Sequence, residues 1–161
     1  MSLAWTDGIS VGNAVIDSDH KNLIGIANNV NRAIRSRDSA TLSKAFVHLE
    51  NWLCVHFANE KRIAHAVNFN FSGHEQEQQY ALNELQHLRD ELAAKRGIWS
   101  DGAVEHFTGF LKHWLIDDHI VRLDMQMKPA LQAHDYTFWP GCKYDETNHT
   151  AGRTANLYLR L

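Results

Sequence analysis

Four long segments of the chain carry apolar residues at helical spacing, and only short breaker sequences separate them. The segments cover approximately residues 18–36, 38–66, 72–96 and 103–128. In the first of them, one stripe repeats at intervals of three and four residues and consists of Leu23, Ala27, Val30 and Ile34. Gly97 closes the third segment, and we expect Pro129 to end the fourth. Because connections this short favour antiparallel neighbours, the sequence predicts an all-α, up-down antiparallel four-helix bundle.

The length of the chain limits it to one such bundle. With 161 residues, of which 44% are hydrophobic, the chain can bury one core and is too short to expect two. We therefore expect a bundle domain over residues 1–130 and an irregular C-terminal extension over residues 131–161. The extension, which contains the aromatic stretch DYTFWPGC, is expected to pack on the bundle or to mediate contacts.

Composition also argues against several classes of protein. The chain has no run of eighteen apolar residues, and its beginning, MSLAWTDGIS, lacks the pattern of a secretory signal, so we expect a cytoplasmic protein without membrane insertion. Cys54 and Cys142 are too few and too far apart for a disulfide framework or a CxxC zinc site. A net charge of −3 without basic clusters argues against a nucleic-acid surface.

Histidine is unusually frequent, with eleven residues, and several lie in a pattern that suits metal binding. In the second segment, His56 and Glu60 are four residues apart and therefore project from one face of a helix. In the fourth segment, His119 and Asp124 are five apart, a spacing that an ideal helix spreads by about 140°. Two ligands so placed can flank one site from opposite sides, or the helix can widen locally into a π-turn.

The other two segments supply histidines at the matching level of the bundle. His20 and His74 lie near the N-terminal ends of the first and third segments, and the ligands of the second and fourth lie near the C-terminal ends. Alternating helix directions bring these ends together. Two carboxylates that can bridge two cations, with imidazoles on each, indicate a di-metal site that suits iron. One HxxxE pair is common as mere support for a surface helix, but four contributing helices are hard to obtain by chance.

Three motifs give the chain a resemblance to a known family: WTDGISVGNAVIDSDHKNLI, then HFANE, then WLIDDHIVRLD. Together they cover roughly residues 4–130, and the chain resembles the hemerythrin-like domains, in particular the bacterial hemerythrins. The resemblance implies a centre of two non-heme iron ions, bridged by oxo or hydroxo, with O₂ as a ligand at an open coordination position. The positions that match the family's metal ligands are His20, His56, Glu60, His74, His119 and Asp124.

One family ligand has no match. The third-helix motif HxxxH begins here at His74, but Gln78 occupies its second position. The resemblance implies that His20 and His56 hold the iron that keeps an open position, whereas His74, Gln78 and His119 surround the other iron. This second iron is therefore expected to be poor in ligands.

Several groups can fill the coordination place at Gln78. Its own carbonyl oxygen is a weaker donor than imidazole, and water or hydroxide can take the place instead. Glu77, three residues from His74, can swing in, but we favour water or Gln78 over Glu77. A histidine of the C-terminal part, His134 or His149, is a less favoured replacement.

The remaining candidates are interpreted as structural. Ile116, one turn before His119, is expected to form a wall of the ligand pocket, and it belongs to a set expected in the core: Trp52, Phe57, Phe110, Trp114 and Ile116. Histidines displaced from the ligand level are expected to be solvated or packed, namely His48, His65, His87, His106 and His113. Cys54 is expected to point away from His56 as a buried apolar filler.

A second exchangeable iron position makes oxidation easier and reversible O₂ carriage less secure. The sequence therefore favours an oxygen or redox sensor whose partner is dioxygen or a related small diatomic or peroxide ligand, with an output domain or protein partner left unidentified. One alternative is a di-iron oxidase or peroxidase that uses the second open position. A second alternative is a metal-free helical interaction domain. Enzymatic activity is thus not the leading hypothesis.

Overall fold

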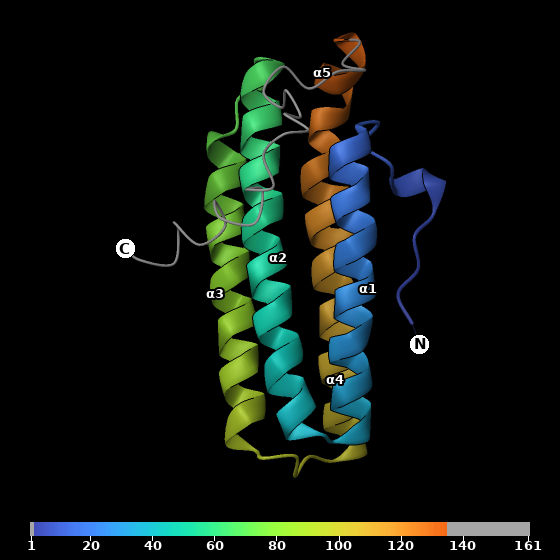
Figure 1. Ribbon diagram of the computed structural model, residues 1–161, viewed down its shortest axis with the longest axis vertical. Coiled ribbons are helices and arrows are strands. Elements are labelled where there is room, and N and C mark those ends of the chain that lie inside the picture. Colours follow the sequence, from blue (N-terminus) through green and yellow to red (C-terminus); the bar gives the residue numbers. More distant parts are fainter. Residues whose placement is uncertain (1, 135–161) are drawn as a thin grey trace, which may run out of the picture.

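Four long helical rods run up and down around one interior in the computed structural model, which describes residues 2–134 (Figure 1). The first three rods are α1 (Ala14–Ser36), α2 (Ser39–Ala66) and α3 (Ser72–Ala94). The fourth rod is continuous but composite, and its parts are α4 (Asp101–Lys112), η2 (His113–Leu123), η3 (Asp124–Met127) and α5 (Lys128–Ala133). Residues 2–134 contain no strand, so the predicted all-α four-helix bundle is confirmed.

Capping side chains set the helix starts. Asn13 accepts hydrogen bonds from the backbone amides of Val15 and Ile16, so α1 begins at residue 14, about one turn earlier than the apolar stripe predicts. Asp38 caps α2 by accepting from the backbone N–H of Thr41. These caps satisfy amide groups that a helix cannot pair internally.

The loop between α3 and α4 requires a glycine. Gly97 has a φ of 81°, and a Cβ built on it would lie 2.8 Å from the carbonyl oxygen of Arg37. Arg37, in the tight turn between α1 and α2, also has a left-handed φ of 55°. The two connections at this end of the bundle therefore pack directly against each other.

Pro129 does not end the fourth rod, contrary to the sequence prediction. The chain remains helical to Ala133, and the proline lies in the first turn of α5. A proline is tolerated there because its missing N–H would lack an intrahelical partner anyway. The predicted extension beyond this point, including DYTFWPGC, Cys142 and His149, lies outside the described residues.

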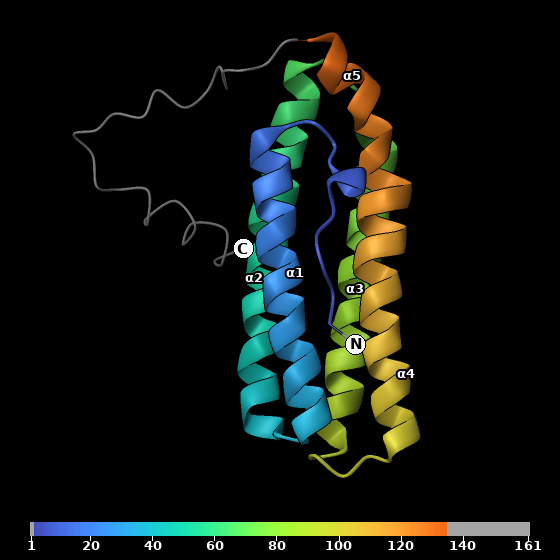
Figure 2. The same ribbon diagram turned by 90° about the vertical axis from the view of Figure 1, so that its right-hand side faces the viewer.

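The N-terminal segment lies along the side of the bundle formed by α1 and α4 (Figure 2). Leu3 is buried, and its backbone N–H and carbonyl pair with the Asn28 side chain at 2.8 and 2.9 Å. This pairing positions Trp5 so that its ring centroid is 6.4 Å from that of His20. The segment, which also includes the short helix η1 (Asp7–Ile9), thereby covers one side of the interior.

Two apolar clusters fill the interior, and a polar layer separates them. The larger cluster includes Leu23 and Phe57, whereas the smaller one includes Ile16 and Ile63. His20 follows Ile16 and precedes Leu23 in α1, and in α2 Glu60 lies between Phe57 and Ile63. The polar residues therefore occupy the level between the two clusters.

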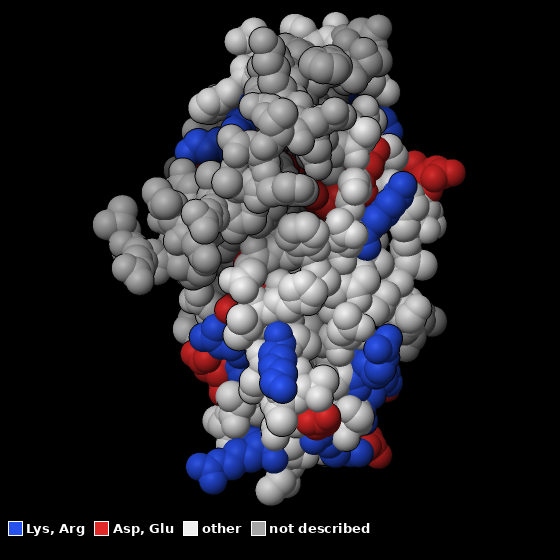
Figure 3. Space-filling model, in the orientation of Figure 1, with Lys and Arg blue, Asp and Glu red and all other residues white. Residues whose placement is uncertain are grey.

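On the described part of the face in Figure 3, charged residues of both signs are mixed. Several form ion pairs between helices, such as Arg89 with Glu50 at 2.8 Å and Arg35 with Glu105 at 3.0 Å. Exposed pairs such as Arg35 with Glu105 contribute little to stability, so the apolar interior is its main source. Among the described residues, no helix is long and apolar enough to span a membrane.

Candidate metal centre

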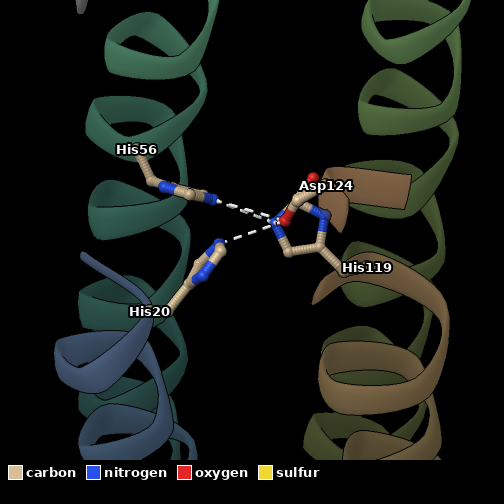
Figure 4. Close-up of side chains that lie close together, drawn as sticks. All are labelled: His20, His56, His119 and Asp124. Atoms are coloured by element: carbon tan, nitrogen blue, oxygen red, sulfur yellow. Dashed lines mark hydrogen bonds and ion pairs between the residues drawn. The ribbon is translucent and has the colours of Figure 1, made fainter. Parts of the chain in front are cut away.

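Four buried side chains from three rods meet in the polar layer (Figure 4). His20 comes from α1, His56 from α2 and His119 from η2, while Asp124 is the first residue of η3. Each offers one possible ligand atom, and these four atoms all lie within 4.8 Å of one another. None of the four residues is more than 3% exposed. One metal ion can therefore contact all four side chains.

Asp124 lies at the centre of this group. Its Oδ2 atom is 3.1 Å from Nε2 of His20, 3.3 Å from Nε2 of His119 and 4.0 Å from Nε2 of His56. The Nε2 atoms of His56 and His119 are themselves 3.0 Å apart. Three imidazole nitrogens and one carboxylate oxygen thus converge on the same small volume.

The other two predicted ligands lie next to this group. Glu60 is fully buried, and its Oε2 is 3.5 Å from Nε2 of His56. His74 is 3% exposed, and its Nε2 is 3.9 Å from Oδ1 of Asp124. All six residues predicted from the sequence are therefore in one buried layer. How they divide between two irons stays a prediction.

A π-helix explains how His119 and Asp124 reach the same site. The segment η2 is a π-helix, and the backbone N–H of Asp124 donates to the carbonyl of His119 at its end. A bond between residues five apart stacks them on one face, which an α-helix would not do. Of the two alternatives that the sequence left open, the structure thus has the π-turn.

Burial sets the protonation of the centre. It lowers the pKa of His20 to about 4 and holds the pKa values of His56 and His119 well below their usual value. The same burial holds the pKa values of Glu60 and Asp124 well above the usual range, and repulsion by Asp124 adds to the effect on Glu60. The imidazoles are therefore neutral and able to coordinate, and burial disfavours the charged form of both carboxyl groups.

The donor inventory fits a bound metal. Three buried atoms of the layer that a metal can pair with have no hydrogen-bond partner among the described residues: Glu60 Oε1, His74 Nε2 and Asp124 Oδ1. Unpartnered buried polar atoms are costly unless something pairs with them. A set of imidazoles and carboxylates suits iron, and a cation here would compensate the carboxylates.

Asp19 is a residue of the site that the sequence did not single out. Its Oδ2 is 3.7 Å from Nδ1 of His56 and accepts a hydrogen bond of 2.8 Å from Asn59 Nδ2. At 3.7 Å the two atoms are in contact but are not hydrogen-bonded. The pairing joins α1 to α2, so only the packing of these helices brings it about.

Gln78 and Glu77, two candidates to fill the missing coordination place, have different surroundings in the structure. Gln78 is buried in the layer, and its Nε2 donates to Oε2 of Glu60 at 2.7 Å. Glu77 lies on the exposed face of α3 and accepts a hydrogen bond of 3.2 Å from Arg122. Of these two residues only Gln78 lies in the buried layer, and which group fills the coordination place stays a prediction.

A cavity of about 70 Å³ lies at the surface between α3 and η2 and reaches His119. Its other lining residues include Tyr80, Trp114 and Arg122. Ile116, the predicted pocket wall, is not among its lining residues; it is half-buried and packs against the larger apolar cluster. Its role in ligand binding stays a prediction.

The residues interpreted as structural lie mainly where expected. The displaced histidines are all exposed: His48, His65, His87, His106 and His113. His134, named as a less favoured replacement ligand, is exposed as well. Phe57 and Trp114 are buried in the core, with the other members of the predicted set packed against it. Cys54 is exposed, so the expectation that it is buried is wrong. It occupies the solvent-facing side of α2, where the apolar stripe does not reach.

Comparisons with known proteins agree with this centre. No family model matches the chain. It is 22% identical to the bacteriohemerythrin of Pseudomonas aeruginosa over 116 residues, which cover 71% of this chain and 72% of that protein. The bacteriohemerythrin of Stenotrophomonas maltophilia is 23% identical over 133 residues, 82% of this chain and 83% of the relative. These matches, together with the helical bundle and its buried group of histidines and aspartate, identify the chain as a homologue of the bacteriohemerythrins.

Proposed function

We propose that this chain is a hemerythrin-like domain that binds two non-heme iron ions and O₂ and acts as an oxygen or redox sensor. The observation that carries the proposal is the convergence of six nitrogen- and oxygen-bearing side chains in one buried layer, four of them within 4.8 Å. The similarity to proteins named bacteriohemerythrins supports the choice of iron and of O₂ as the ligand.

Six residues of the layer would hold the iron ions, namely His20, His56, Glu60, His74, His119 and Asp124. The carboxylate of Asp124 lies within 4.0 Å of Nε2 of four of these residues, the histidines, so it would serve the centre as a whole. Bound iron supplies redox chemistry and an open position for O₂. The protein holds the imidazoles neutral and oriented and places two carboxylates to compensate the positive charge.

Aromatic rings line the donor layer. The ring of Phe57 lies 5.3 Å from that of His119 and 5.7 Å from that of His56, measured between centroids. Trp114 stacks on His119 at 6.3 Å, and Phe71 stacks on His74 at 5.1 Å. An apolar wall admits a small neutral ligand such as O₂ more readily than ions, which suits a sensor.

An anaerobic titration of the metal-free protein with Fe²⁺ tests this proposal. We expect uptake to saturate at two irons per chain and the absorption spectrum to change when the loaded protein meets air. His48→Ala is a suitable control, because His48 is exposed and lies two turns from His56. Saturation at one iron or none would contradict the di-iron proposal. Sustained O₂ consumption with added reductant would favour an oxidase over a sensor.

A further inference from the structure

The surface cavity between α3 and η2 extends to a residue of the metal centre. His119 lines this cavity of about 70 Å³ and also belongs to the buried group of possible ligands. Because His119 is only 3% exposed, it lies between the cavity and the rest of the donor layer. A cavity of this size can hold several water molecules. A small hydrated species inside it would therefore be separated from the centre by one side chain.

Acidic side chains dominate the wall of this cavity. Glu77 and Glu84 of α3 and Asp118 of η2 line it, and Arg122 supplies the one positive charge among its lining residues. Three carboxylates against one guanidinium leave an excess of negative charge. Tyr80 donates a hydrogen bond of 2.8 Å to Glu84 but adds no charge. A hollow lined by one sign of charge concentrates ions of the opposite sign, so this wall attracts cations.

Arg122 connects the two sides of the cavity. Its Nη2 donates to Oε2 of Glu77 across to α3 at 3.2 Å, and its Nε donates to Oδ1 of Asp118 at 3.4 Å. The three side chains are between 41% and 53% exposed. Ion pairs this exposed cost little to break. Arg122 can therefore release both carboxylates to an arriving cation.

We propose that this cavity is the entrance through which a hydrated divalent cation, Fe²⁺ in the proposed function, reaches the metal centre. The inference rests on that proposed function. The acidic wall and the contact with the centre are independent observations, and both point to a metal ion. The three carboxylates attract the cation, Arg122 limits access by holding two of them, and His119 is the first ligand of the centre that the cation meets.

Anaerobic stopped-flow mixing of the metal-free full chain with Fe²⁺ measures the rate of loading. Trp114 stacks on His119 with ring centroids 6.3 Å apart, so quenching of tryptophan emission reports the arrival of iron. We expect Glu84→Gln to slow loading roughly fivefold at low ionic strength, the effect of one unit charge on a nearby divalent ion in water. Arg122→Gln should accelerate loading by a similar factor, and salt should reduce both effects. The control Glu91→Gln removes an exposed carboxylate of the same helix and should load as the wild type does.

Filling the cavity tests the same role without changing a charge. Ala81 lines the cavity, and Ala81→Leu places a larger side chain in it. Loading should slow at least as much as in Glu84→Gln, and the effect should persist at high salt. The final iron content should match that of the wild type. The matched control is Ala93→Leu, which enlarges an exposed position of the same helix.

Each outcome separates the entrance from the proposed function. Full iron content with loading rates that neither Glu84→Gln nor Ala81→Leu changes would contradict the entrance and leave iron binding intact. If Ala81→Leu slows only the reaction of the preloaded protein with O₂, the cavity is a route for gas and the proposal is wrong. Absence of iron uptake by the wild type would overturn the proposed function instead.

A folding defect in the filled variant would not prevent a decision. If circular dichroism shows that Ala81→Leu does not fold, Glu84→Gln decides, because this substitution keeps the size of the side chain and removes only its charge. A loading rate in Glu84→Gln equal to that of the wild type at low ionic strength would then contradict the proposal.

Discussion

Asp124→Asn is expected to abolish iron loading and to raise the melting temperature of the metal-free protein. The Asp124 carboxylate is within 4.0 Å of the ligand nitrogens of four histidines, so its loss should affect both iron positions. We expect affinity for iron to fall at least about 100-fold, because even residues that only orient ligands contribute up to that factor.

The stabilisation of the metal-free form follows from the burial of this carboxylate. Burial raises the pKa of Asp124, so folding is favoured while the group is protonated, and this stability is lost as the pH rises from the unfolded pKa toward the folded one. Asparagine cannot ionise, so the variant avoids the cost of burying a charge. Replacing buried charged groups by neutral ones stabilises proteins by on the order of 1–4 kcal/mol. The gain should be present near neutral pH and should shrink at about pH 4.

Thermal melts of the metal-free wild type and of Asp124→Asn, near neutral pH and at about pH 4, test this prediction together with iron analysis. The control is Asp117→Asn, which removes an exposed carboxylate from the same helical segment and should change stability by less than about 0.5 kcal/mol. A variant that loads iron normally, or that melts below the wild type near neutral pH, would show that Asp124 has another role.

Iron should stabilise the wild type strongly, and the stabilisation should decline as the pH falls. Iron at about 1,000 times its dissociation constant adds about 4 kcal/mol, equivalent to roughly 10 °C in melting temperature for a chain of this size. Binding requires ionised carboxylates, and burial raises the pKa values of Glu60 and Asp124. The pKa of His20 is lowered to about 4, so its imidazole competes little for protons.

Iron binding therefore releases protons from the carboxylates, and affinity should rise with pH. Calorimetry in two buffers of different ionisation enthalpy measures the released protons directly, and melts at about pH 6 and pH 8 measure the change in stabilisation. Asp124→Asn serves as the control and should show no iron-dependent shift. Equal stabilisation at both pH values without proton release would contradict the assignment of the buried carboxylates as ligands.

The helices and the ligand layer could be predicted because they depend on local patterns. Apolar residues at intervals of three and four indicated the four helical rods. Gly97 marked the loop between α3 and α4, where the backbone conformation requires a glycine. His56 and Glu60 could be placed on one face because their spacing is one helical turn. Alternating helix directions then brought the ends that carry His20 and His74 to the same level.

Other features depend on packing and could not be predicted. The five-residue spacing of His119 and Asp124 fits two geometries, and only the hydrogen bonds of the π-helix decide between them. The contact between Asp19 and His56 arises because α1 and α2 lie side by side (Figure 1). Glu60 and Gln78 likewise lie on different helices, so no spacing in the sequence indicates their hydrogen bond.

A crystal structure of the iron-loaded protein, with anomalous scattering recorded at the iron edge, tests the central claim most directly. We predict two anomalous peaks in the buried layer, both among the side chains of His20, His56, Glu60, His74, His119 and Asp124. Peaks at exposed histidines such as His113, or an iron-free layer after full anaerobic loading, would contradict the assignment of this layer as the metal centre.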